Sequence, residues 1–285
     1  MKNNLVSVIY AGLLGMAMAT GAGAEEPQLL QINSTNDWAG KWRTEEQLRT
    51  VTRDGDVVFE ATGDQRLNSA GSLTIETNAV YKLSGYFRAK PGTKPGKLYF
   101  GVMPFDEKKM LINSPPINVI TNSDTELLAP CRKDDKKLVV KNAAGWKTSD
   151  GAMVAFDIKD DYGDLPNRKL SESGINNIRK TDNGWEIELK GICRFDFPAG
   201  TRLREHISGG NYLYAAVCNL VTPAEWKYFE GKVSGMAKYG LPQDQWWAGT
   251  KQGGIVILAN YQDKQGESVT QFKAVKLEKI SGAAR

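Results

Sequence analysis

Short runs that alternate apolar and polar residues recur along most of the chain, and Gly, Asn, Asp and Pro separate them. Alternation with a period of two places the apolar side chains on one face of a β-strand. In one run Trp185, Ile187 and Leu189 share a face, and Asn183-Gly184 before it predicts a two-residue hairpin turn. The clearest predicted strands are 56–61, 72–76, 81–88, 97–103, 137–141, 153–158, 185–190, 212–219, 254–261 and 271–279.

Helical patterns are nearly missing from the sequence. No segment carries an apolar stripe of helical spacing over three turns, and 42–51 and 223–229 have at most the pattern of single short helices. The recurring strands and turns therefore predict an all-β protein built from sandwiches or barrels.

Composition narrows the classes of function. With 41% hydrophobic and 25% charged residues, the chain has the composition of a globular protein. Its net charge of +4, without a run of Lys and Arg, argues against nucleic-acid binding. The single histidine, His206, excludes a metal site built from several histidines. A Ser-His or Cys-His hydrolase would have to use the same residue.

The first 24 residues have the features of a secretory signal peptide. Lys2 is their only charge, an apolar run extends from Leu5 to Met18, and 22–24 reads Ala-Gly-Ala, which is typical of a cleavage site. We expect cleavage after Ala24 and a secreted or periplasmic mature protein. No later segment reaches the ~20 apolar residues of a membrane span, so we expect no membrane insertion of the mature chain.

Three cysteines leave the disulfide pattern open. Cys131 follows Ala-Pro, whereas Cys193 and Cys218 lie in apolar, strand-like runs. Export would permit one disulfide among the three, and three buried thiols would fit the sequence as well. No Cys-x-x-Cys spacing occurs, which excludes a zinc or thioredoxin-type motif.

Two blocks of predicted strands have a recognisable order. The first is the run 81–89, then a Gly/Pro-rich turn and 98–102; the second comprises 226–235, 249–251, 255–261 and the closing strand 272–277. These blocks resemble galactose-binding-like jelly rolls, the sandwiches of carbohydrate-binding modules attached to xylanases, laminarinases and related glycanases. The resemblance implies a discontinuous jelly-roll β-sandwich, 27–117 plus 227–281, interrupted by a small inserted β-rich domain at 118–226.

Sugar binding would use aromatic rings, which stack on the C–H faces of pyranoses. Tyr81 and Tyr99 lie on alternating strands, and we expect them in the core. Aromatic residues in Gly-, Gln- or Lys-containing segments are better candidates for a ligand site, with at least one outside 118–226 exposed: Trp38, Trp42, Trp146, Trp246 and Trp247. Because neighbours on an extended chain point to opposite sides, one of the adjacent tryptophans would face outward if the segment is extended. The alternative is that both pack into the edge of the sandwich.

A second hypothesis is catalytic. Arg202, Arg204 and His206 alternate along an extended segment and would share a face, as a polysaccharide lyase needs for its base and its anion-stabilising groups. Tyr212 or Tyr214 would then act as the acid. The alternative is that His206 belongs to a turn and pairs with its neighbouring glutamate.

An acidic loop offers oxygen ligands for calcium. Asp160, Asp161 and Asp164 lie close together, but they lack the spacing and the closing Glu of an EF-hand. Modules of the resembled fold often hold a structural calcium near their first and last strands, and here the last strand lacks the usual acidic pair. Calcium is therefore the one cofactor that the sequence suggests, at a weak site.

The expected function is a secreted, non-catalytic carbohydrate-binding or surface-recognition protein whose partner is a polysaccharide or glycan. The alternatives are a lyase-like enzyme centred on Arg204 and His206, and a structural or protein-interaction component of the cell envelope. The oligomeric state stays open at this point.

Overall fold

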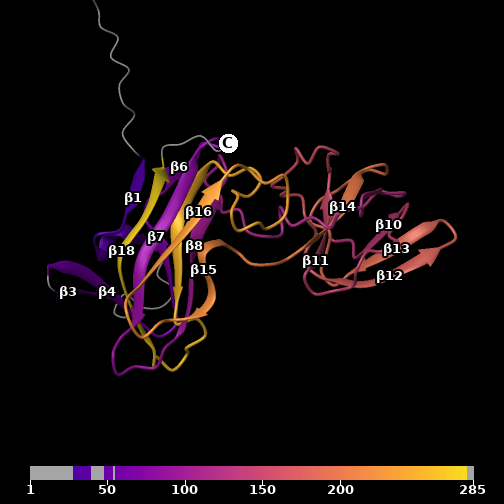
Figure 1. The fold of residues 1–285 in the computed structure, drawn as a ribbon. Coiled ribbons are helices and arrows are strands. Elements are labelled where there is room, and N and C mark those ends of the chain that lie inside the picture. The colour runs from indigo at the N-terminus through magenta and orange to yellow at the C-terminus, as the bar shows by residue number, and fades with distance from the viewer. Residues whose placement is uncertain (1–27, 40–47, 54, 281–285) are drawn as a thin grey trace, which may run out of the picture.

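The computed structural model describes residues 28–39, 48–53 and 55–280, and these are almost entirely β (Figure 1). The predicted leader, 1–24, lies outside the described residues. The one helix of the described chain is the 3-10 turn Thr35–Asp37, and none is long and apolar enough to cross a membrane. The all-β prediction is confirmed. Neither segment with the pattern of a short helix is a helix where the structure describes it: strand β16 begins at Lys227 and strand β3 at Leu48, while 42–47 lie outside the described residues.

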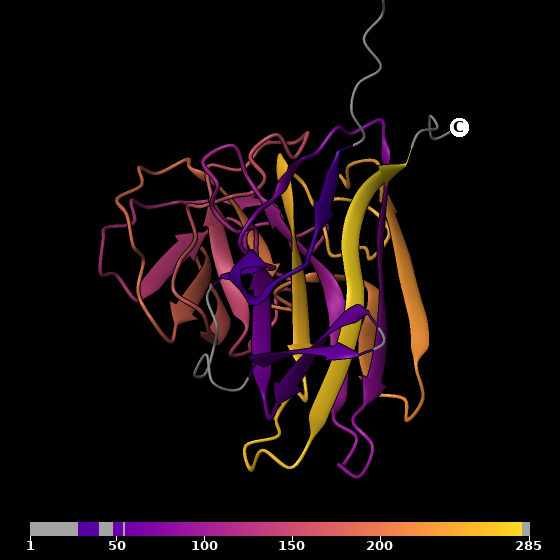
Figure 2. The same cartoon turned by 90° about the vertical axis from the view of Figure 1, so that its left-hand side faces the viewer.

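Two stacked antiparallel sheets form a sandwich (Figure 2). Sheet A has the order β16–β7–β18–β4–β3, and β1 also pairs with β18; the strands are Lys227–Ser234, Val80–Ala89, Val269–Ile280, Asp56–Thr62, Leu48–Arg53 and Leu29–Gln31. Sheet B has the order β15–β8–β17–β5–β2, and β6 also pairs with β17; the strands are Leu213–Val221, Lys97–Phe105, Gln252–Ala259, Gln65–Ser69, Trp38–Ala39 and Leu73–Thr74.

The strands cross between the sheets in the manner of a jelly roll. One strand lies in sheet A and the other in sheet B in each of four consecutive pairs: β4–β5, β7–β8, β15–β16 and β17–β18. Alternation along each strand divides the side chains between two faces. On β7, Tyr81, Leu83 and Phe87 are fully buried between the sheets, where they meet Phe100 of β8 and Phe272 of β18. Burial of these large rings and aliphatic groups is the main stabilising contribution to the sandwich.

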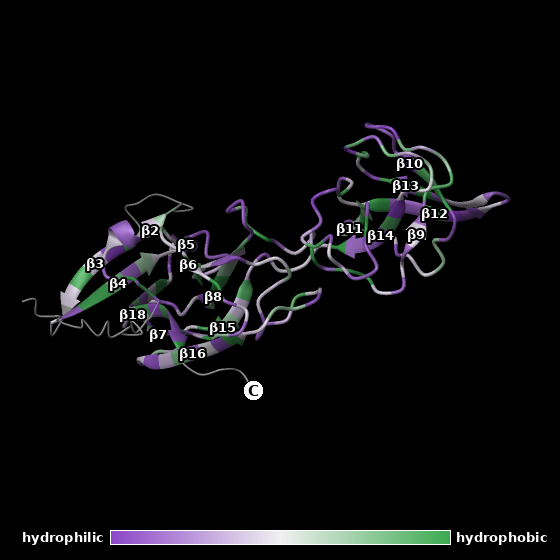
Figure 3. Cartoon of the chain, turned by 90° about the horizontal axis from the view of Figure 1, so that it is seen from above, coloured by the Kyte–Doolittle hydropathy of each residue, from purple (hydrophilic) through white to green (hydrophobic). Residues whose placement is uncertain are grey.

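A second group of strands lies between β8 and β15 in the sequence and projects from the side of the sandwich (Figure 3). We call it the insert. It has two three-stranded sheets, β10–β13–β12 and β11–β14–β9, over a core of its own. The strands, in chain order, are Thr125–Glu126, Lys137–Val140, Ala152–Phe156, Ile175–Thr181, Gly184–Leu189 and Arg202–Ile207.

The hairpin between β12 and β13 turns one residue earlier than expected. The turn residues are Asp182 and Asn183, and Gly184 already pairs with Thr181. Gly184 has a positive φ of 126°, and a side chain there would collide with the Val140 carbonyl oxygen, 2.6 Å from an added Cβ. The close approach of strand β10 therefore requires glycine at this position.

The chain enters and leaves the insert at neighbouring points. The Asn118 side-chain amide donates to the Ile207 carbonyl at 3.0 Å, and the Ile207 N–H donates to the Asn118 carbonyl at 3.0 Å. Strand β15 follows and pairs with β8 of sheet B, so the expected end of the insert at 226 is too late. A strand-like pattern does not specify its pairing partner, and for this reason the sequence could not separate β15 from the insert.

Candidate functional site

The tryptophans expected to bind a ligand in the sandwich are core residues. Trp38 is 4% exposed, and Trp246 and Trp247 are fully buried. Trp38 packs edge-on against Phe272 with ring centroids 5.9 Å apart, and Trp246 packs against Tyr81 at 5.5 Å. The prediction of exposed stacking rings is wrong for these three residues. Trp42 lies outside the described residues.

The adjacent tryptophans are both buried because they do not lie on a regular strand. Trp246 forms an isolated bridge with Met236, and the chain turns immediately after Trp247. The indole N–H of Trp247 donates to the Pro242 carbonyl at 3.1 Å. The polar residues before the pair therefore belong to a loop that directs both rings into the core, and the in–out rule for extended chain does not apply.

Trp146 is also structural. It is 8% exposed in the core of the insert, and its indole N–H donates to the Ser123 carbonyl at 2.9 Å. This hydrogen bond satisfies the one polar atom of an otherwise apolar side chain. The structure therefore places Trp146 in the core of the insert, where little of its ring is available to a ligand.

The proposed catalytic histidine is inaccessible. His206 lies on β14, is fully buried, and its Nδ1 is 2.7 Å from the Pro115 carbonyl oxygen. Burial lowers the pKa of His206 to about 4, so the imidazole is neutral at neutral pH, and Nδ1 is the nitrogen that donates to the carbonyl. A substrate proton cannot reach this ring without opening the junction between the insert and the sandwich.

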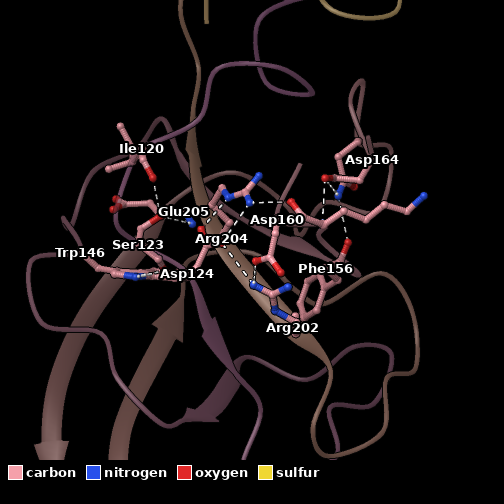
Figure 4. A network of polar contacts seen from close by, with 12 residues as sticks. Ile120, Ser123, Asp124, Trp146, Phe156, Asp160, Asp164, Arg202, Arg204 and Glu205 are labelled. Atoms are coloured by element: carbon pink, nitrogen blue, oxygen red, sulfur yellow. Dashed lines mark hydrogen bonds and ion pairs between the residues drawn. The ribbon is translucent and has the colours of Figure 1, made fainter. Parts of the chain in front are cut away.

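Both arginines beside it form ion pairs within the insert, Arg204 in its interior and Arg202 at its surface (Figure 4). Arg204 is 1% exposed and donates from Nε and Nη2 to both carboxylate oxygens of Asp124, at 2.7 and 3.0 Å. Its guanidinium also lies 4.2 Å from the centre of the Tyr162 ring. Arg202 is half exposed and pairs with Asp160 at 2.6 Å. Because each cation already has a carboxylate partner, the face that they share is not a substrate-stabilising site.

The acidic loop uses its carboxylates in the same internal way. Asp160 pairs with Arg202, Asp161 accepts the Gly163 N–H at 2.8 Å, and Asp164 accepts the Lys159 N–H at 2.9 Å. Across the described ranges, no group of three or more His, Cys, Asp or Glu side chains is arranged to hold a metal ion. The three aspartates therefore make hydrogen bonds and an ion pair within the insert, and the weak calcium site at this loop stays a prediction.

A different cluster lies open on the outer face of sheet B. The residues there alternate with core residues along each strand: Tyr99 between Leu98 and Phe100 on β8, and Tyr214 beside Leu213 on β15. Together with Tyr212, just before β15, and Tyr261, just after β17, they line a pocket of about 350 Å³. Asp64 and Arg66 line the same pocket. We call this the tyrosine pocket, and its volume lies within the range of small-molecule sites.

The rings of the tyrosine pocket are close and mutually inclined. Tyr99 lies 4.9 Å from Tyr214 and 5.3 Å from Tyr261, and Tyr212 lies 6.1 Å from Tyr214. Arg66 donates from Nη1 to the Tyr212 hydroxyl at 3.0 Å. Burial raises the pKa of the Tyr99 and Tyr214 phenols, so both keep their hydroxyl protons at neutral pH. The pocket therefore presents apolar ring surface beside neutral hydroxyls, a carboxylate and a guanidinium.

Comparison with known proteins gives little to identify the chain. No family model matches it, and no curated protein matches it. Among solved structures it is similar to the CBM22-1 xylan-binding domain from Paenibacillus barcinonensis Xyn10C, with 11% identity and a TM-score of 0.35 over 91% of this chain and 99% of that one. It is also similar to the CBM22-1-CBM22-2 tandem domain from the same protein, with 11% identity and a TM-score of 0.29 over 93% of this chain and 49% of that one. These neighbours are carbohydrate-binding modules, the class that the sequence resembles, but TM-scores below 0.5 carry no argument about this chain's ligand.

Proposed function

We propose that this chain is an exported glycan-binding protein and that a sugar residue of its ligand occupies the tyrosine pocket. The observation that carries the proposal is the pocket itself, in which four tyrosines surround about 350 Å³ on the face of one jelly-roll sheet. Tyrosine rings offer flat apolar surface to the C–H groups of a pyranose, and their hydroxyls exchange hydrogen bonds with sugar hydroxyls.

The polar residues of the pocket suit a neutral or weakly polar ligand. Asp64 accepts hydrogen bonds, Arg66 donates them, and protonated phenols such as Tyr214 do both. A sugar hydroxyl also donates and accepts, so these groups can orient a ring without a net charge on the ligand. The proposed role is binding without chemistry, because the candidate base His206 is fully buried elsewhere.

The test is a glycan array on the mature protein, followed by titration calorimetry with the best ligand. Tyr261→Ala removes a ring at the edge of the pocket and should lower the affinity about tenfold, the loss expected for a stacked aromatic worth roughly 1–2 kcal/mol. Tyr228→Ala is the matched control, because Tyr228 is 42% exposed on β16 of the opposite sheet. Its affinity should equal that of the wild type.

The proposal fails if no glycan binds, or if Tyr261→Ala binds as tightly as wild type. An equal loss of affinity in Tyr228→Ala would place the ligand on sheet A instead. Melting temperatures of both variants, measured in parallel, separate a loss of ligand contact from a loss of folding.

A further inference from the structure

The insert brings two of the three cysteines into one buried cluster. Cys131 is 2% exposed and Cys193 is fully buried, and both belong to the core of the insert. Cys218 is exposed on β15, in the sandwich. The structure therefore separates the odd cysteine from the other two, a distinction that the sequence leaves open.

Backbone pairing holds the two buried cysteines on neighbouring segments. Cys131 and Phe197 exchange N–H···O=C hydrogen bonds of 2.9 and 2.7 Å, so their segments run antiparallel. Four residues away, Cys193 donates its N–H to Asp135 and accepts from Asp134, both at 2.8 Å. Segments 131–135 and 193–197 thus lie side by side, each anchored at both ends.

The two thiols also meet. The Cys131 thiol donates to the Arg132 carbonyl and the Cys193 thiol to the Phe195 carbonyl. Each cysteine still shifts the pKa of the other, upward for Cys131 and downward for Cys193, because both thiols lie in the same apolar core, which includes Phe197. Within the described part of the chain, no third His, Cys, Asp or Glu joins them in a group that could hold a metal. A pair of adjacent thiols without further metal ligands is the arrangement expected of a disulfide precursor rather than of a zinc site.

We propose that Cys131 and Cys193 form a structural disulfide when the chain folds in an oxidising compartment, and that Cys218 stays reduced. The oxidant is another disulfide, such as that of a thiol oxidoreductase or oxidised glutathione. One cysteine thiolate attacks it, and a mixed disulfide forms as one thiol leaves. The second cysteine thiolate then attacks the mixed disulfide, which forms the Cys131–Cys193 bond and releases the second thiol. Two protein thiols are oxidised, and one donor disulfide is reduced to two thiols.

The burial of both sulfurs determines when this reaction occurs. Exchange needs a thiolate that an oxidant can reach, and neither sulfur is accessible in the folded insert. The bond therefore forms while the insert folds, and afterwards its burial protects it from reductants. It would close the chain around strands β10 to β13, which lie between the two cysteines in sequence.

The experiment compares full-length mature protein refolded with oxidised glutathione and with dithiothreitol. After denaturation in acid and alkylation at the free thiols, the oxidised sample should carry one alkyl group, on Cys218, and the reduced sample three. Proteolysis without reductant should yield one linked peptide pair, containing Cys131 and Cys193. Three alkylated cysteines in the oxidised sample, or a linked peptide containing Cys218, would overturn the proposal.

Thermal unfolding supplies an independent measurement. Closing a loop of this length should raise the melting temperature of the insert by about 10 °C relative to the reduced protein. Cys193→Ala should melt at the same temperature in both redox conditions, near the value of the reduced wild type. Cys218→Ala is the matched control and should keep the full redox-dependent shift. If Cys193→Ala keeps that shift, the pairing is wrong.

Discussion

Strand β14 of the insert and the tyrosine pocket both gather polar side chains, but only one of them is open. Around β14, Arg204 and Asp124 satisfy each other, and His206 is sealed against Pro115. In the tyrosine pocket, four rings line a pocket of about 350 Å³. The difference shows that a cluster of chemically versatile residues indicates a functional site only when its hydrogen-bonding groups remain available to a ligand.

Removing one member of the closed cluster should have the largest effect on stability. In Asp124→Ala the guanidinium of Arg204, 1% exposed, loses its carboxylate, and a buried unpaired charge costs about 3–5 kcal/mol of unfolding free energy. Urea denaturation measures this loss. Asp160→Ala is the control, because its pair with Arg202 lies at the surface and should contribute less than about 1 kcal/mol. Equal losses in the two variants would contradict the distinction.

Acid should act on the same region through His206. Its folded pKa of about 4 lies below its ordinary value of 6.5, so the unfolded chain binds the proton first as pH falls. Stability is complete above pH 6.5 and falls between pH 6.5 and 4, by about 3 kcal/mol in all. Unfolding free energies across this range measure the effect.

The pH experiment needs a variant that isolates the histidine. His206→Asn keeps a donor for the Pro115 carbonyl but does not titrate, so its stability should depend less on pH in this window. Burial raises the pKa of Glu205, so Glu205 changes the unfolding free energy with pH in the opposite direction. The stability that it contributes is lost as pH rises above the ordinary pKa of a glutamate. The difference between the wild type and His206→Asn removes the Glu205 contribution, and identical pH profiles would exclude His206 as the cause.

In the open cluster, a single hydroxyl should matter for binding and not for folding. Tyr214→Phe keeps the ring that packs on Tyr99 and removes the phenol oxygen. One hydrogen bond to a ligand is worth about 1 kcal/mol, so the affinity should fall several-fold at an unchanged melting temperature. A stability loss without an affinity loss would show that the hydroxyl serves the fold.

Removing the whole insert should have the smallest effect on glycan affinity. Because Asn118 and Ile207 are hydrogen-bonded neighbours, a short Gly linker can join residue 118 to residue 208 and replace the insert. The tyrosine pocket lies outside 119–207, so glycan affinity should not change. Calorimetry on the shortened protein tests this, with cooperative unfolding as the control. Loss of binding in a folded sandwich would show that the insert contributes to the site.

Particular residues explain which strands the sequence could predict. Strand β13 alternates Trp185, Ile187 and Leu189 with charged residues, and its period of two was sufficient to identify it. Strand β5, Gln65–Ser69, has Leu67 as its one apolar residue, so alternation gave no signal. Strand β5 forms because it pairs with β17, although its own sequence has no alternating pattern.

The candidate site was harder to predict than the fold. Tyr99 was expected in the core because it lies on an alternating strand, although alternation with the buried Leu98 and Phe100 assigns it to the opposite face. In sheet B that outer face is itself partly apolar, and a local pattern cannot distinguish an outer aromatic cluster from a core. No sequence pattern points to Arg66 as a site residue, because its place in the pocket depends on a hydrogen bond to Tyr212, which is distant in sequence.

The central position of strand β18 in sheet A has a consequence for how the chain folds. Strand β18 lies between β7 and β4 and pairs with both, so sheet A cannot join these two strands before β18 is in place. Strand β18 also pairs with β1, where Leu29 lies opposite Glu278, which is distant in sequence. Pairings between such distant segments form slowly, whereas the hairpin β12–β13 closes over a two-residue turn. During synthesis the insert is therefore complete while its host still has unpaired strand edges. We expect the insert to fold first and the sandwich to depend on chaperones until its final strand is released.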